Sequence, residues 1–371
     1  MSKLFEKTDI NGMSLSNRFI RSATWEGMAD DEGNVTPKLY DTIKSLAAGG
    51  IGLIISGHTY VTKCGQASPW QAGIYSDDMI AGLKELTTMV HQKSMSIVCQ
   101  LAHAGNLANE AMTGVVPMVA SNFEGLAESP RCEMTVQDIK KLVSDFAEAA
   151  QRAKLAGFDG VQIHAAHGYL LSQFLSPASN RRNDEYGGSI QNRSKIHLEV
   201  YKAIRETVGK DYPVLVKLNS QDYIENGLEL KDSVYVGKLL ADNGIDAIEL
   251  SGGTFASGKL SPSRSTINSK EKEAYFTEAA RIFKQEIKTP LILVGGMRSF
   301  GVAEHLIDSE AADYISFSRP LIREPGLINR WKKGDRGKAK CISCNKCFEP
   351  ALTGKGIICV AEQRLKEKSS S

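Results

Sequence analysis

The chain has 371 residues, 42% of them hydrophobic, which is enough for two average domains or one large α/β barrel. Its 45 lysines and arginines against 43 aspartates and glutamates leave a net charge of +2, which argues against nucleic acid or a membrane surface as partner. No apolar run approaches the length of a membrane span and no secretion signal is apparent, so we expect a cytoplasmic protein.

Residues 3–16 predict a short ribbon, because Asn11-Gly12 favours a two-residue turn. Eight apolar, strand-like runs follow, at residues 18–24, 52–56, 96–101, 160–164, 214–218, 247–251, 291–294 and 314–317. Helical segments alternate with them, at residues 37–48, 78–93, 138–156, 191–208, 231–243, 271–287 and 299–308. Two helices begin with a capping signal, Ser76 before the second and Thr135 with Asp138 at the third.

This alternation predicts the α/β class and a TIM (β/α)₈ barrel. A doubly wound open sheet is less favoured, because no G-x-G-x-x-G motif follows the first strand. We expect the barrel to occupy residues 1–335 and a cysteine-rich C-terminal segment residues 336–371. The long connection at 102–137 is expected to fold over the barrel mouth, and it should shape the pocket together with 254–270.

The chemistry of such a barrel lies where its strands end. The residues at these ends are Ser22 to Trp25, Gly57 and His58, Gln100 and His103, His164, His167 and Tyr169, Lys217 and Asn219, Ser251 to Gly253, Gly295 and Gly296, and Ser318 and Arg319. The last two ends are typical of a phosphate site, since glycines let backbone N–H groups approach and Arg319 adds a two-pronged cation. Lys217 is equally consistent with a ligand contact and with a buried ion pair.

Several segments carry a resemblance to a known family. The strongest are Ile163-His-Ala-Ala-His-Gly-Tyr-Leu170, Gln173-Phe-Leu-Ser-Pro177 and Asn183-Asp-Glu-Tyr-Gly-Gly188, supported by Asn17-Arg18, Gln100-Leu-Ala-His-Ala-Gly105 and Ser318-Arg319-Pro320. Over residues 5–330 the chain resembles the Old Yellow Enzyme family of FMN-dependent oxidoreductases. Taken alone, the motif His164-x-x-His167 would favour a pair of structural histidines.

The resemblance implies FMN at the barrel mouth, reduced by NADH or NADPH, and hydride transfer from flavin N5 to the activated C=C bond of an unsaturated carbonyl compound. His164 and His167 would bind the carbonyl oxygen, and Tyr169 would protonate the α-carbon. The cofactor-binding residues would be Ala23, Thr24, Gly57, Gln100, Lys217, Gly295, Gly296, Ser318 and Arg319.

Two positions depart from the commoner family pattern. Lys217 stands where arginine is frequent, which keeps the positive charge but loses the two-pronged geometry. Trp25 stands where some members carry a redox-tuning cysteine. We expect Trp25 either to wall the substrate pocket or to pack as an ordinary loop residue.

Four cysteines, Cys341, Cys344, Cys347 and Cys359, lie within nineteen residues of the C-terminal segment. They resemble the iron–sulfur segment of the 2,4-dienoyl-CoA reductase and trimethylamine dehydrogenase branch, with one residue fewer between the second and third cysteines. A [4Fe-4S] cluster is therefore favoured over a structural Zn²⁺ site, and both over metal-free thiols. The branch's flavodoxin-like FAD/NAD(P) domain is absent here, so an electron-donor protein is an expected partner.

Three functions follow, in order of preference. The first is an FMN-dependent ene-reductase, and the second an FMN and iron–sulfur electron-transfer subunit of a larger complex. The third is a flavin-free aldolase with Lys217 as Schiff-base nucleophile. The sequence names no particular substrate and leaves the oligomeric state open, a homo-oligomer included.

Overall fold

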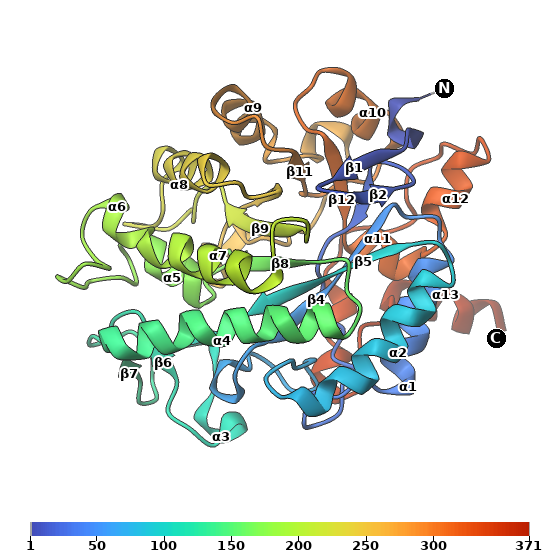
Figure 1. Ribbon diagram of the computed structural model, residues 1–371. Coiled ribbons are helices and arrows are strands. Elements are labelled where there is room, and N and C mark those ends of the chain that lie inside the picture. Colours follow the sequence, from blue (N-terminus) through green and yellow to red (C-terminus); the bar gives the residue numbers. More distant parts are fainter. Residues whose placement is uncertain (1, 371) are drawn as a thin grey trace.

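A closed barrel of eight parallel strands forms the centre of the computed structural model, which describes residues 2–370 (Figure 1). In barrel order the strands are β3 (Phe19–Arg21), β4 (Leu53–Tyr60), β5 (Ser96–Ala102), β8 (Gly160–Ala165), β9 (Val214–Asn219), β10 (Ala247–Ser251), β11 (Leu291–Leu293) and β12 (Tyr314–Phe317). Each of them coincides with one of the eight predicted runs. The predicted TIM barrel is therefore confirmed.

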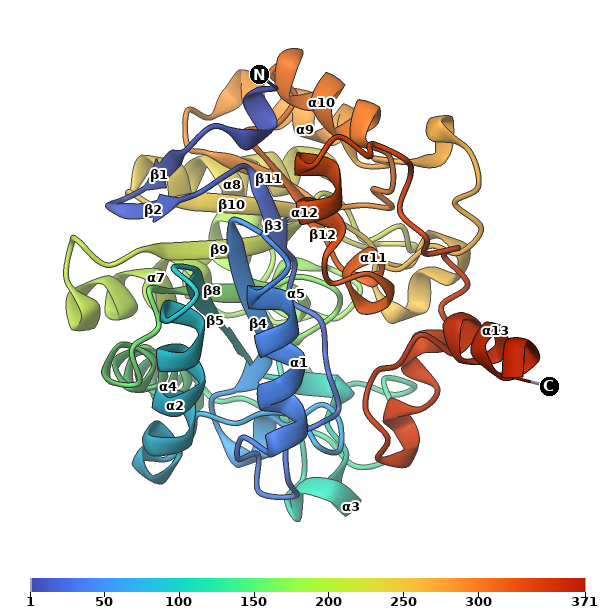
Figure 2. The same ribbon diagram turned by 90° about the vertical axis from the view of Figure 1, so that its right-hand side faces the viewer.

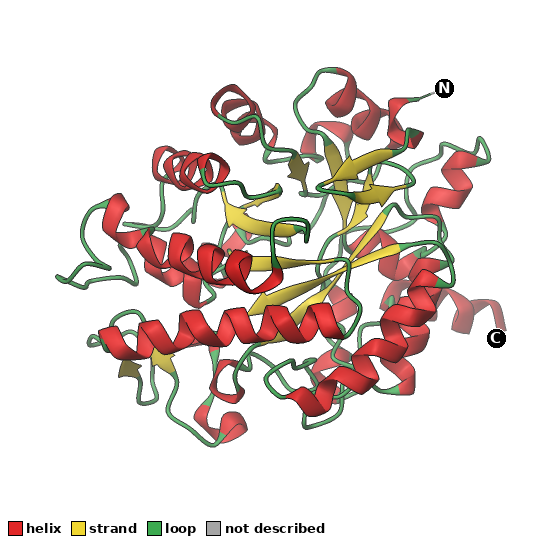
Figure 3. Cartoon of the chain, viewed as in Figure 1, coloured by secondary structure: helices red, strands yellow, loops and turns green. Residues whose placement is uncertain are grey.

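Helices surround the strands on the outside (Figure 3). The main ones are α1 (Pro37–Ala47), α2 (Ile80–His91), α4 (Val136–Leu155), α7 (Lys195–Val208), α8 (Leu230–Asp242), α9 (Thr277–Glu286) and α10 (Phe300–Asp308). The two predicted caps are present. Ser76 accepts a hydrogen bond from the N–H of Asp78 ahead of α2, and Thr135 and Asp138 form a reciprocal capping box at α4.

Two helix boundaries differ from the prediction. The segment 191–208 is divided at Ser194 into α6 (Ile190–Arg193) and α7. The segment 271–287 becomes α-helical at Thr277, because Ala274 has φ 52° and so cannot belong to a right-handed helix. Neither difference moves a strand end.

The N-terminal ribbon closes one end of the barrel. Strands β1 (Thr8–Ile10) and β2 (Met13–Leu15) pair antiparallel around Asn11 and Gly12, whose φ angles are 47° and 82°. Such positive φ angles are what a tight hairpin turn requires, and they favour this residue pair. The buried apolar side chains of the ribbon pack against those inside the barrel. The other end of the barrel stays available for a ligand.

The C-terminal segment runs along one side of the molecule, on the right in Figure 2. After α11 (Arg319–Arg323) and α12 (Leu327–Lys332) it contains the short 3₁₀ turns η7 (Lys346–Phe348) and η8 (Ala351–Thr353), then α13 (Val360–Ser370). Ala339 donates a hydrogen bond to the carbonyl of Arg298, and Ile357 donates to that of Glu26. Among the described helices, none is both long and apolar enough to span a bilayer.

Candidate active site

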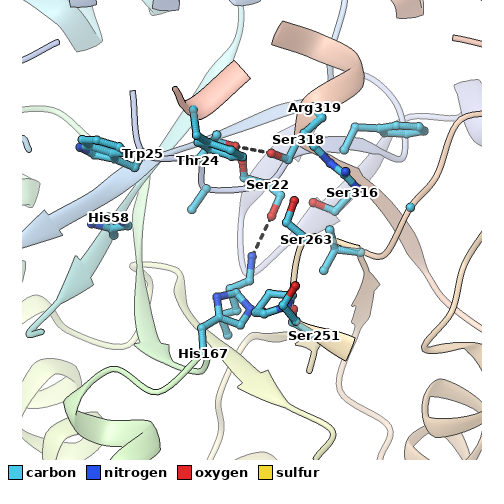
Figure 4. A pocket seen from close by; sticks show the side chains of 18 of the residues that line it. Ser22, Thr24, Trp25, His58, His167, Ser251, Ser263, Ser316, Ser318 and Arg319 are labelled. Carbon is cyan, nitrogen blue, oxygen red and sulfur yellow. Dashed lines mark hydrogen bonds between the residues drawn. The ribbon is translucent and has the colours of Figure 1, made fainter. Parts of the chain in front are cut away.

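A cavity of about 490 Å³ lies at the ends of the barrel strands. It is lined by most of the residues that the sequence nominated, namely Ala23, Thr24, Gln100, His164, His167, Tyr169, Lys217, Gly296, Ser318 and Arg319. Figure 4 shows Thr24, Ser318 and Arg319 on one side of it and His167 and Ser251 on the other. Gly57 and Gly295 do not line it, although their neighbours His58 and Gly296 do.

The two histidines stand together at the end of β8. His164 belongs to the strand and is 3% exposed, and its Nδ1 is buried without a hydrogen-bond partner among the described residues. His167 follows with φ 64°, and its N–H donates to Oδ1 of Asn219 at 3.2 Å. Its Nε2 lies 2.7 Å from Oγ of Ser251, and the two imidazole centroids are 5.3 Å apart.

Both imidazoles are neutral at pH 7. Burial lowers the pKa of His164 and of His167 well below the ordinary value, and the positive charge of Lys217 lowers both further. A neutral imidazole keeps one N–H to donate. The pair can therefore donate hydrogen bonds to an oxygen atom without contributing positive charge.

Tyr169 lies directly after the histidines, at the N-cap of α5 (Leu170–Leu175). Its ring centroid is 4.5 Å from that of His164, and its Oη is 3.1 Å from Nε2 of His58. Burial raises the pKa of Tyr169 above the ordinary value for a phenol, so the hydroxyl keeps its proton at neutral pH. The side chain can act as a proton donor.

The contact between His58 and Tyr169 could not be predicted, although His58 was recognised at a strand end. The pairing of β4 with β5 changes register between Ile55 and His58. Such an irregularity changes which way the following side chains point, and here His58 lines the cavity.

Lys217 forms the buried ion pair that one of its two interpretations predicted, and it also lines the cavity. Its Nζ is 3.3 Å from Oε1 of Glu249 and donates to Oγ of Ser22 at 2.7 Å. Burial works to raise the pKa of Glu249, but Lys217 and the hydrogen bonds from its polar neighbours hold it below the usual value. Glu249 was missed, and the signal was a single acid within the apolar run 247–251.

A chain of amide hydrogen bonds extends this network across the barrel. Gln162 donates to Oε2 of Glu249 at 2.9 Å, and Gln100 donates to Oε1 of Gln162 at 2.7 Å. Because Gln100 uses an N–H toward the barrel interior, its carbonyl oxygen can accept a hydrogen bond from a ligand. Lys217 and Gln100 thus offer a cation and an acceptor to one cavity.

On the opposite side of the barrel, the ends of β11 and β12 place two arginines at the cavity. Arg319 donates to Oδ1 of Asn345, and Ser318 lies 2.8 Å from Oγ1 of Thr24. Arg298 also lines the cavity, is 7% exposed and was missed, although it follows the glycine pair by two residues. Gly296 has φ 69°, and a Cβ there would lie 2.7 Å from the ring of Tyr275, so glycine is required.

Two loops were expected over this cavity, and one of the predictions was wrong. The loop 254–270 contributes Phe255, Ser261, Pro262 and Ser263. Residues 102–137 contribute none, because Arg182 holds this segment aside by donating to the carbonyls of Ala120 and Met134. The C-terminal segment covers the cavity instead, through Ser343, Asn345, Phe348 and Leu352. Trp25 also lines the cavity.

The four C-terminal cysteines, Cys341, Cys344, Cys347 and Cys359, line one small second pocket together with Arg319 and Asn345. Yet within residues 2–370 no three Cys, His, Asp or Glu side chains are gathered as ligands of one metal ion. Around a tetrahedral Zn²⁺ the sulfurs would lie only about 3.8 Å apart, given Zn–S bonds of about 2.3 Å.

Comparison with known proteins gives a consistent result. The model of the NADH:flavin oxidoreductase / NADH oxidase family matches residues 3–337. The chain is 34% identical to an NADH oxidase of Thermoanaerobacter brockii, over 92% of this chain and 52% of the relative. It is 37% identical to an NADPH dehydrogenase of Geobacillus thermodenitrificans, over 87% and 91%.

Among solved structures, a 2-naphthoyl-CoA reductase complex superposes with a TM-score of 0.89 at 26% identity, over 96% of this chain and 56% of that one. The chain therefore spans about half the length of some of the proteins that it matches and nearly all of others.

Proposed function

Because the chain belongs to the NADH:flavin oxidoreductase / NADH oxidase family, we propose that it is an FMN-dependent NAD(P)H oxidoreductase that reduces the activated C=C bond of unsaturated carbonyl compounds. The observation that carries this proposal is the convergence of His164, His167 and Tyr169 on one cavity, with Lys217 and Gln100 beside them. Family membership argues against the flavin-free aldolase, and so does the ion pair that Lys217 makes with Glu249.

The cavity suits FMN at both of its sides. Gln100 and Lys217 provide an acceptor and a cation for the carbonyl and imide edge of a flavin ring, and Arg298 and Arg319 lie where a phosphate needs cations. The residues that we assign to FMN are Ala23, Thr24, Gly57, Gln100, Lys217, Gly295, Gly296, Ser318 and Arg319. Held by these residues, FMN would supply the hydride chemistry that links NADH or NADPH to the β-carbon of the substrate.

The chain's own residues then act on the substrate oxygen and the α-carbon. His164 and His167 donate hydrogen bonds to the carbonyl oxygen, and these bonds strengthen as negative charge develops there. The unpartnered Nδ1 of His164 supports this role, because a buried polar atom without a partner costs about 1–3 kcal/mol until a ligand satisfies it. Tyr169 donates its phenolic proton to the α-carbon.

For the C-terminal cysteines we propose a [4Fe-4S] cluster held by Cys341, Cys344, Cys347 and Cys359. A cluster of this kind passes single electrons to or from a flavin. Arg319 and Asn345 line both the cavity and the cysteine pocket, so the two sites share a wall. This shared wall favours a second candidate function, an electron-transfer subunit that an electron-donor protein reduces.

An anaerobic absorption spectrum, combined with iron, zinc and flavin quantitation, tests both cofactors at once. We expect a yellow protein that NADH or NADPH bleaches and an enone such as cyclohexenone recolours. A purified protein that holds no flavin and cannot be reconstituted with FMN would overturn the proposal. Fast reduction by NADH alone would argue against the electron-transfer role.

A further inference from the structure

The hydrogen bonds around Gln71 fix which way its amide points. Gln71 is 1% exposed, and its Oε1 accepts from the backbone N–H of Ala67 at 2.7 Å. Its Nε2 donates to the backbone carbonyl of His58 at 3.0 Å. A backbone N–H can only donate and a carbonyl can only accept, so the opposite orientation of the amide would lose both bonds.

This orientation determines the tautomer of His58. The same Nε2 of Gln71 lies 2.7 Å from Nδ1 of His58. An amide nitrogen cannot accept, so Nδ1 is the acceptor and carries no hydrogen. Burial lowers the pKa of His58 to about 4, which leaves the ring neutral at pH 7 with its one hydrogen on Nε2.

The tautomer in turn determines what Tyr169 can do. Nε2 of His58 lies 3.1 Å from Oη of Tyr169, and with its hydrogen it donates to the phenol oxygen. The O–H of Tyr169 therefore cannot point at His58. It is free to point into the cavity that both side chains line together with His164.

We propose that His58 and Gln71 are positioning residues that direct the phenolic O–H of Tyr169 at the substrate and stabilise the phenolate left behind. The inference rests on the proposed function, in which Tyr169 is the proton donor. In that step the O–H bond of Tyr169 breaks and a C–H bond forms at the α-carbon, while the negative charge of the enolate moves to the phenolate. The Nε2–H of His58 strengthens its bond to Oη as that charge appears.

The first test reads the tautomer directly, by NMR of the FMN-loaded protein with ¹⁵N-labelled histidine. We expect His58 to carry its hydrogen on Nε2, with its signals assigned by their absence from the His58→Gln variant. A hydrogen on Nδ1 would overturn the inference. This reading requires neither substrate nor turnover, and the only variant it needs is His58→Gln, which serves to assign the signals.

The second test is a double-mutant cycle on the alkene-reduction step, followed by stopped-flow absorbance. His58→Phe is expected to slow this step by about tenfold to a hundredfold, and His58→Gln, which retains an N–H donor, to recover most of the rate. In a Tyr169→Phe background, His58→Phe should cause no further loss, because its effect acts through the phenol. Equal losses in both backgrounds would indicate a merely structural role and reject the proposal.

Two variants in the loop that contains Gln71 distinguish the effect of its amide from a general disturbance of the loop. Gln71→Leu should slow alkene reduction less than His58→Phe, because His58 remains but its tautomer is released. Gln66→Leu removes the bond from Gln66 to the carbonyl of Ser68 in the same loop and should change nothing. If Tyr169→Phe leaves alkene reduction unchanged, the proposed donor is wrong, whatever tautomer the NMR spectrum shows.

Discussion

The mouth of the barrel and the cysteine pocket differ in what holds them together. At the mouth, Lys217, Glu249 and Ser22 are already bonded to one another, and Lys217 and Glu249 stand on the paired strands β9 and β10. In residues 338–359 of the C-terminal segment, here called the tail, four thiols surround a small pocket. The only helical elements described between α12 and α13 are the short 3₁₀ turns η7 and η8. The protein itself therefore preorganises the first site, whereas the second would depend on the proposed iron–sulfur cluster for completion.

The largest expected effect is on the tail. Where metal binding is coupled to folding, it is worth on the order of 10 kcal/mol. Removal of iron by a chelator, or the substitution Cys344→Ser, should therefore make residues 338–359 sensitive to protease while the barrel stays folded. Limited proteolysis with mass spectrometry and iron quantitation would measure this.

The matched control is Cys132→Ser, since Cys132 is exposed and lies outside the cysteine pocket. It should alter neither the iron content nor the protease sensitivity. Equal protease resistance of the tail with and without metal would show that both sites are preorganised, and the contrast between them would be lost.

The next largest effect tests the mouth. Glu249→Ala leaves Lys217 buried without its carboxylate and should lower the free energy of unfolding by about 3–5 kcal/mol. The double variant Lys217→Met/Glu249→Leu should recover most of this loss, because no charge is left unpaired. Chemical denaturation of the FMN-free protein measures both variants. A loss below about 1 kcal/mol for Glu249→Ala would mean that the bonds among Lys217, Glu249 and Ser22 do not stabilise this end of the barrel.

Replacement of Tyr169 tests the chemistry of the mouth rather than its stability. Tyr169→Phe should slow alkene reduction about a hundredfold or more, which is at least about 2.7 kcal/mol of activation free energy. Reduction of the flavin by NADH should be nearly unchanged, because the proposed function gives the phenol a role only toward the substrate. Stopped-flow traces of the two half-reactions separate these effects, and equal slowing of both would contradict the assignment.

The parts of this site that could be predicted are those that local sequence determines. Strand ends follow from apolar periodicity, and the motif from His164 to Tyr169 lies on one short segment, so its residues reach one cavity together. The ion pair of Lys217 with Glu249 joins neighbouring strands, and no local pattern specifies which acid a buried lysine meets. No local pattern specifies the contact between His58 and Gln71 either. It depends on the register change that precedes His58 and on the loop that carries Gln71.

The wrong prediction for residues 102–137 has the same cause. Length and composition favoured a covering loop, but the position of this segment is set by Arg182, which comes after the next barrel strand. The tail that covers the cavity instead is distant in sequence from every catalytic candidate. Long-range contacts of this kind require the three-dimensional arrangement.

The smallest expected effect is the acid response of the barrel. His103 and His197 are each 2% exposed, and burial lowers the pKa of each to about 4. The unfolded chain therefore binds more protons between pH 6.5 and pH 4, so stability is complete above this window and falls as the pH decreases through it. When the pH is lowered from 7 to 5.5, each histidine should lower the free energy of unfolding by about 1 kcal/mol. Denaturant midpoints of the FMN-free protein at several pH values measure how steeply the unfolding free energy falls with decreasing pH. The substitution His197→Leu should reduce this slope by the contribution of one histidine. An unchanged slope in this variant would show that His197 does not contribute, and the acid response of the barrel would then need another origin than its buried neutral imidazoles.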